Sequence, residues 1–165
     1  MASLAELHIV PVSISYEWES CDKLKAMEMY ISRFQKYEKK PGEDLNSVLT
    51  GVKQPKGRVH FHFGSELSAT VLESFGTCSS GEFYKKVAEW MDRQICGNYV
   101  LWPNNYFAHD LRDGSEAYLN HYTLKEKDLF VQHLAWIDEH KDLDRELLKS
   151  IFLGIYANPV DKKNL

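Results

Sequence analysis

Hydrophobic and polar positions alternate along the chain with two different spacings, one typical of strands and one typical of helices. Residues 9–16 are rich in β-branched side chains and place apolar residues on both faces, which is typical of a strand covered on both sides. Residues 58–63 alternate strictly and predict a second strand with one apolar face. Pro11 cannot donate a backbone hydrogen bond, so we expect it at the start of a strand, on an edge or at a bulge.

Apolar residues at helical spacing predict amphipathic helices over most of the remaining chain. The expected helices cover residues 22–37, 43–51, 67–72, 82–95, 106–111, a segment that opens at Thr123, and a last one from about residue 142 to Asn158. Ser79 and Thr123 each stand three residues before a glutamate, the pattern of a capping box. Pro159 is expected to end the last helix. The predicted fold class is α/β but predominantly helical, with few strands, at about 9–16 and 58–63.

No internal repeat, low-complexity tract or shift in composition divides the chain, so the sequence predicts a single domain over residues 1–165. The inventory of elements is nevertheless uneven, because an isolated two-stranded ribbon is only marginally stable in water. Either the two strands join a sheet supplied from elsewhere, or the helices provide the hydrophobic core.

Composition excludes several classes of protein. The chain is 44% hydrophobic and 27% charged, as is ordinary for a globular protein, and its net charge of -4 argues against a general nucleic-acid binder. Its 3 cysteines lie far apart, without the spacing of a zinc site or a disulfide framework. No secretory leader and no apolar run of the ~20 residues that span a bilayer is present. The sequence therefore predicts a cytoplasmic protein that would meet a membrane only from the side.

Four stretches carry a family resemblance. Residues Ile9–Ile14, with the sequence IVPVSI, resemble the fourth conserved block of the glycerolipid acyltransferases. Three further stretches are similar to bacterial members of that family, and they are Pro41–Gly51, Lys56–Phe61, and Asp92–Ile95 together with Asn98–Tyr106. The resemblance covers most of the chain from about Ile9 to about Asp110.

The resemblance implies transfer of an acyl group from an acyl thioester, acyl-CoA or acyl-ACP, to the hydroxyl of a glycerol-phosphate lipid in phospholipid biosynthesis. It implies that Val10, Pro11 and Val12 line or support the substrate pocket, and it implies no bound cofactor. In the family a histidine and an aspartate separated by four residues precede this strand, with the histidine as general base. No residue matches that pair here, so we expect the C-terminal part of a larger acyltransferase fold and assign no catalytic residue.

His133 and Asp138 have a similar spacing but are rejected as a substitute for that pair. They follow the resembling strand, whereas the family order is the reverse. A separation of five residues also places two side chains about 140° apart around a helix. A half-exposed helix face is the simpler interpretation.

Two other groups of side chains suggest binding. His60 and His62 share one strand face and could begin a metal site, but no third ligand has compatible spacing, so no metal site is assigned. The cations Lys53, Lys56 and Arg58 are candidates for contact with phosphate or lipid headgroups, and peripheral membrane association follows from them. No nucleic-acid partner is expected, and the oligomeric state is open.

Two interpretations compete with the acyltransferase. One is a non-enzymatic helical module that binds a protein partner or a membrane surface through an exposed sheet edge and a basic patch. The other is a small metal-dependent hydrolase built on His60 and His62.

Overall fold

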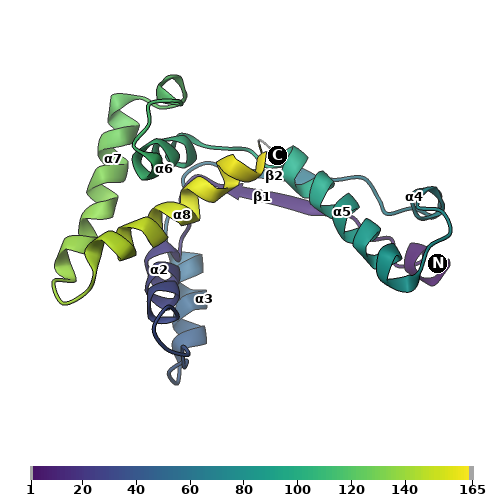
Figure 1. Ribbon diagram of the computed structural model, residues 1–165, viewed down its shortest axis with the longest axis horizontal. Coiled ribbons are helices and arrows are strands. Elements are labelled where there is room, and N and C mark those ends of the chain that lie inside the picture. Colours follow the sequence, from purple (N-terminus) through teal and green to yellow (C-terminus); the bar gives the residue numbers. More distant parts are fainter. Residues whose placement is uncertain (1, 164–165) are drawn as a thin grey trace. The chain divides into compact units, whose positions relative to one another are not determined.

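The computed structural model describes residues 2–163, with side chains from residue 4 onward (Figure 1). The chain is mostly helical (61%) and has one two-stranded antiparallel sheet, which confirms the predicted fold class. The strands are β1 (Val12–Tyr16) and β2 (Val59–Phe63). The helices are α1 (Ala2–Ala5), α2 (Asp22–Ile31), α3 (Glu43–Lys53), α4 (Ala69–Ser74), α5 (Ser80–Asn98), α6 (Pro103–Asp113), α7 (Leu124–Leu134) and α8 (Arg145–Lys163). Short 3₁₀ turns cover Leu119–His121 and Ala135–Glu139.

The chain folds into two compact units, although its composition shows no break between them. Unit 1 contains residues 1–15 and 59–100, and unit 2 contains residues 16–58 and 101–165. The chain therefore crosses between the units three times, and each unit is built from two separate segments.

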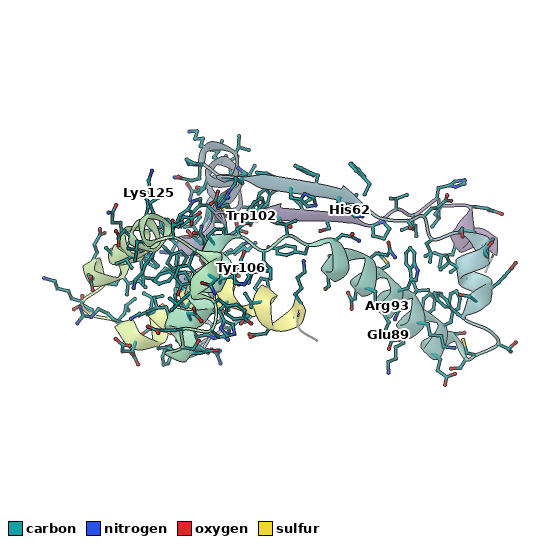
Figure 2. The ribbon with its side chains drawn as sticks, turned by 90° about the horizontal axis from the view of Figure 1, so that it is seen from above. His62, Glu89, Arg93, Trp102, Tyr106 and Lys125 are labelled. Carbon is teal, nitrogen blue, oxygen red and sulfur yellow. The ribbon has the colours of Figure 1, made fainter. Side chains whose placement is uncertain are left out.

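Unit 1 contains most of the β1–β2 ribbon together with α1, α4 and α5. Strands β1 and β2 run side by side (Figure 2). Gly64 N donates to Pro11 O at one end of the ribbon (2.8 Å), and Glu17 N donates to Arg58 O at the other (2.9 Å). These two bonds fix the register, in which Ser13 lies opposite His62 and Ser15 lies opposite His60.

Unit 2 is organised around α8, on which α2 and α6 pack (Figure 1). The fully buried Phe130 of α7 joins the same core and contacts the rings of Phe107, Phe152 and Tyr156 at 5.2–6.2 Å. The capping box predicted at Thr123 is present at the start of α7, and the one predicted at Ser79 is present at the start of α5 in unit 1.

Helix α2 is shorter than the helix predicted over residues 22–37, since it ends at Ile31 instead of about Tyr37. The residues that follow serve the beginning of α3 instead. Lys40 N donates to Glu43 Oε2 (2.9 Å), and the Tyr37 hydroxyl donates to the other oxygen of the same carboxylate. Helix α6 is longer than predicted because Pro103 occupies its first turn, where the missing N–H costs nothing.

The prediction that Pro159 ends the last helix is wrong, because α8 continues through Pro159 to Lys163. A proline inside a helix removes one backbone hydrogen bond and crowds the carbonyl four residues before it. The next residue, Val160, is fully buried. Burial of that side chain offsets the cost and keeps the final turn helical.

No helix among the described residues is both long and apolar enough to cross a membrane.

Candidate functional site

The residues that the resemblance assigns to the substrate pocket lie at the beginning of β1. Pro11 is buried and stands just before the strand, where its missing N–H takes nothing from the ladder. Val10 and Val12 are 42% and 40% exposed. The expectation that the strand is covered on both sides is therefore not met within the described chain.

An ordinary two-stranded ribbon at a protein surface covers its apolar face. In this ribbon the polar face is covered instead. Ser13 and Ser15 of β1 are 2% and 0% exposed, and Ser15 Oγ accepts a hydrogen bond from Val100 N (2.9 Å). Side chains alternate between the two faces along each strand and directly opposite side chains share a face, so the other face is apolar apart from Tyr16 at the end of β1. We call it the ribbon face, and it consists of Val12, Ile14, Val59, Phe61 and Phe63, which are 39–71% exposed.

Arg58 is held in unit 2 by an acidic and aromatic cluster. Its Nη2 lies 2.7 Å from Glu17 Oε1 and 3.3 Å from Glu126 Oε1, and its guanidinium stacks 5.0 Å from the ring of Trp102. Partial burial alone would raise the pKa of Glu17, but the hydrogen bonds from Arg58 outweigh it and the pKa is lowered. The guanidinium is thus already paired with carboxylates, and its contact with phosphate stays a prediction.

Gly57 brings Arg58 to this position. Its φ of 62° lies in the left-handed region, and a Cβ there would be 2.5 Å from Glu17 Oε2 and 2.9 Å from Trp18 Cδ1. Only glycine allows the turn to approach Glu17 so closely. The resembling stretch Lys56–Phe61 is therefore shaped by this contact.

The two lysines of the predicted phosphate contact lie at the end of α3. Lys53 is its last residue, and the Lys56 ammonium donates to the carbonyls of Gly51 and Gln54. Cations at this end of a helix are favoured by its dipole. Both lysines thus stabilise the end of α3, and their contact with phosphate or lipid headgroups stays a prediction.

His60 and His62 lie on the partly covered face of the ribbon, as the strand period predicted. Among residues 2–163, no group of three or more histidine, cysteine or acidic side chains is placed to hold a metal ion. The structure therefore adds no third ligand to the pair.

A buried polar triad in unit 2 consists of Asp22, His133 and Tyr156, and sequence reasoning missed it. Asp22, at the start of α2, is 4% exposed. Its Oδ2 lies 2.7 Å from His133 Nε2 and accepts the Tyr156 hydroxyl at 2.6 Å. Burial and the neighbouring Asp22 carboxylate raise the pKa of Tyr156, so this phenol stays protonated and keeps donating.

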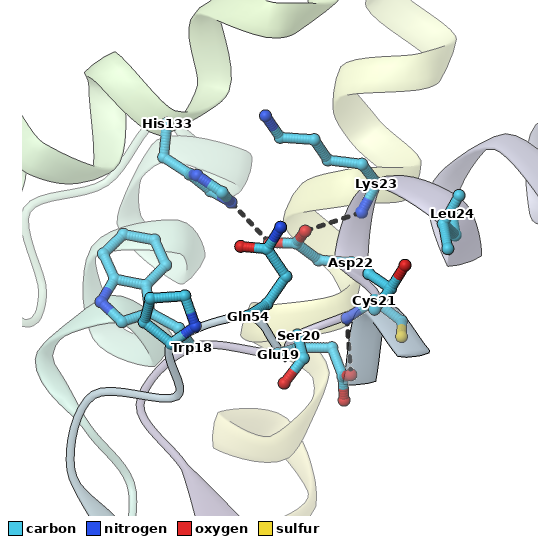
Figure 3. A pocket seen from close by; sticks show the side chains of 11 residues that line it. Trp18, Glu19, Ser20, Cys21, Asp22, Lys23, Leu24, Gln54 and His133 are labelled. Carbon is cyan, nitrogen blue, oxygen red and sulfur yellow. Dashed lines mark hydrogen bonds and ion pairs between the residues drawn. The ribbon is translucent and has the colours of Figure 1, made fainter. Parts of the chain in front are cut away.

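Asp22 and His133 of the triad line a pocket of about 490 Å³ in unit 2 (Figure 3). His133 and Asp22 face one another at its wall, and Trp18 packs edge-on against the imidazole at 4.8 Å between centroids. The rest of the lining comes from the start of α2 and the end of α3, and it comprises Glu19, Ser20, Cys21, Lys23, Leu24, Thr50, Gln54 and Pro55.

This arrangement can move a proton. A carboxylate accepts only, so Nε2 of His133 carries a hydrogen, and in the neutral ring Nδ1 then holds the lone pair. An imidazole oriented by a buried carboxylate is the form that a general base takes. His133 and Asp138 do not share one α-helix as the sequence predicted, because α7 ends at Leu134 and Asp138 lies in the 3₁₀ turn that follows.

Local sequence spacing gives no signal for this triad. Asp22 and His133 are 111 residues apart, and Asp22 and Tyr156 are 134 apart. Only the packing of α2 and α7 around α8 brings the three side chains together.

Comparison with protein-family models, curated proteins and solved structures finds no match for this chain.

Proposed function

We propose that this chain is the C-terminal part of a glycerolipid acyltransferase, which transfers an acyl group from a thioester to the hydroxyl of a glycerol-phosphate lipid. On this proposal the chain supplies a substrate-lining strand and the helices that support it. The general base comes from a histidine–aspartate pair on a preceding segment of the same protein.

The observation that carries the proposal is that stretches with the family resemblance, far apart in the sequence, contact one another. Ile9–Ile14 and Lys56–Phe61 contribute to the two strands of the ribbon and meet at one position, where the register places Ile14 opposite Phe61. The second of these stretches also contacts Asn98–Tyr106, because Arg58 stacks on Trp102. Three of the four stretches with the resemblance therefore contact one another in the fold.

The side chains of Asn104 and Asn105 support the same interpretation, since each has a defined partner. Asn104 is 3% exposed and its amide donates to Glu17 O (2.7 Å). Asn105 is 4% exposed, donates to Tyr156 O (2.8 Å) and accepts from Trp102 N (2.7 Å). These asparagines therefore hold the turn rigid beside Arg58, which gives this part of the resemblance a physical role.

The ribbon face agrees with a substrate or a further sheet layer lying over β1. Contiguous exposed apolar surface on a soluble protein marks a site of interaction. Val10 and Val12 stand at the beginning of this face with the buried Pro11 between them, and the resemblance assigns these three residues to the acyl or glycerol-phosphate pocket.

The test is acyl transfer by the polypeptide that the complete reading frame around residues 1–165 encodes. Phosphatidic acid formed from a radiolabelled acyl thioester and lysophosphatidic acid is measured. Val12→Asp should lower kcat/KM by about tenfold or more, because a carboxylate on an apolar contact costs at least about 1.4 kcal/mol. Val131→Asp, at a valine of α7 that is 47% exposed, is the matched control and should leave transfer unchanged.

Two results would contradict the proposal. One is the absence of transfer to any glycerol-phosphate acceptor by the wild-type polypeptide. The other is equal loss in the Val12 and Val131 variants, which would remove the ribbon face from the reaction.

A second candidate function rests on the triad, in which His133 acts as general base on a substrate in the pocket of unit 2. Acyl transfer or ester hydrolysis by residues 1–165 alone, abolished by His133→Ala, would favour this candidate. Such a result would also overturn the assignment of the base to a preceding segment.

A further inference from the structure

Helix α3 presents an apolar stripe to solvent. Its members are Leu45, Val48, Leu49 and Val52, which are 64%, 62%, 44% and 76% exposed. The spacing i, i+3, i+4, i+7 places them within about 100° of one another around the helix. We call these four side chains the α3 stripe.

The opposite side of α3 faces the protein. Ser47 O accepts the Cys21 thiol (3.5 Å), and a Cβ on Gly51 would lie 3.8 Å from Cys21 Sγ. Thr50 lines the pocket at the start of α2. Small and polar residues therefore make the contact with the rest of unit 2, and the apolar side of this amphipathic helix is left outside.

Charge is segregated to the same segment. The whole chain has a net charge of -4, but residues 36–56 carry five lysines and three acidic residues. The lysines flank the α3 stripe at both ends, as Lys36, Lys39 and Lys40 before the helix and Lys53 and Lys56 at its end. Lys39 is paired with Asp44 at 2.6 Å, which neutralises one lysine and one acid and leaves the excess of lysines in the segment unchanged.

We propose that α3 is a membrane-contact helix, which lies on an anionic lipid bilayer with the α3 stripe in the acyl-headgroup boundary. An exposed apolar stripe bordered by cations is the pattern of an interfacial helix, because the side chains enter the boundary while the lysines reach lipid phosphates. The proposal of membrane contact rests on these residues alone and does not depend on acyl transfer.

A protein partner fits this surface less well. A stable protein interface uses roughly 20–30 residues on each side, with few charges at its centre. The α3 stripe has four apolar side chains, and lysines surround them. Anionic lipid needs only a narrow apolar strip and complements the positive charge.

The experiment is co-sedimentation of the 165-residue protein with two kinds of vesicle, phosphatidylcholine alone and phosphatidylcholine mixed with an equal amount of phosphatidylglycerol. The protein should bind the mixed vesicles and be released by high salt, which screens the lysines. Val48→Glu should lower the partition coefficient by about tenfold or more, because burying one valine contributes about 1.5 kcal/mol or more. Both Val48 and the control position Val131 are exposed, so neither variant disturbs the core.

Val131→Glu adds the same charge at a matched exposed valine and should bind as the wild type does. The proposal is overturned if the wild type does not bind mixed vesicles, or if Val48→Glu and Val131→Glu bind equally. It is also overturned if the wild type forms a dimer that Val48→Glu abolishes without any binding to lipid, since the stripe would then serve a second copy of the chain.

Discussion

Asp110 holds the loop after α6 through a set of hydrogen bonds to one buried carboxylate. It is 3% exposed and accepts from the Ser115 hydroxyl (2.7 Å), Tyr118 N (3.0 Å) and the Tyr122 hydroxyl (2.9 Å). Burial and the bond to Asp110 raise the pKa of Tyr122 to about 12, so the phenol remains a donor at neutral pH. The carboxylate therefore ties residues 115–122 back to α6.

Asp110→Ala should lower the free energy of unfolding by about 3 kcal/mol, because it leaves several donors without their charged acceptor. Urea denaturation followed by circular dichroism measures the change. Asp128→Ala removes an exposed aspartate of α7 and should change stability by less than about 0.5 kcal/mol. Equal effects of the two substitutions would contradict the role given to Asp110.

Glu126 makes stability depend on pH. Its pKa is lowered from 4.5 because the Thr123 N–H donates to it, which outweighs partial burial, and Arg58 adds to the effect. A lowered pKa in the folded state means that this stabilisation is complete above about pH 4.5 and is lost as the pH falls through the folded pKa. The difference in unfolding free energy between wild type and Glu126→Gln should shrink on acidification. A difference that stays constant or grows, measured by urea denaturation at neutral and acidic pH, would contradict this.

Residue-scale prediction from sequence worked where the cause is local. The capping boxes at Ser79 and Thr123 are both present, because each needs only residues three apart. The Asp22–His133 pair has no local cause, since it depends on the packing of three helices. For the same reason, sequence reasoning could not find the partner of His133.

At the scale of elements, the sequence predicted that helices exist better than it predicted where they end or which side they bury. The period of residues 43–51 indicates an amphipathic helix, and α3 forms. An amphipathic pattern ordinarily predicts burial of the apolar side, and here that side is exposed. The side of α3 that carries Ser47 and Gly51 contacts Cys21, just before α2, and the apolar side points away from that contact.

Thr123→Ala tests the start of α7. The threonine hydroxyl accepts from Glu126 N (3.3 Å) and donates to its carboxylate (2.8 Å), so its loss should cost about 1 kcal/mol of unfolding free energy. Ser150→Ala, at an exposed position inside α8, should be neutral or slightly stabilising, because alanine has the higher helix propensity. A loss as large for Ser150→Ala as for Thr123→Ala would show that the cap contributes nothing.

At the scale of the whole molecule, the sequence predicted the fold class and the small number of strands, but it gave no sign of two units. The division follows from which segments pack together, and composition is even across it. The uneven inventory was a better guide. It indicated that the strands need a covering layer, and the ribbon face is in fact exposed.

We propose that the ribbon face, and not the pocket beside His133, meets the acyl-transfer substrates. The most direct measurement is photo-crosslinking of the polypeptide from the complete reading frame with a photoreactive lysophosphatidic acid, followed by mass spectrometry of the labelled peptides. We predict label on peptides that contain Val10–Ile14 or Val59–Phe63, reduced by competition with unmodified lysophosphatidic acid. Label confined to Trp18–Leu24 and His133, with none on the ribbon, would contradict the claim.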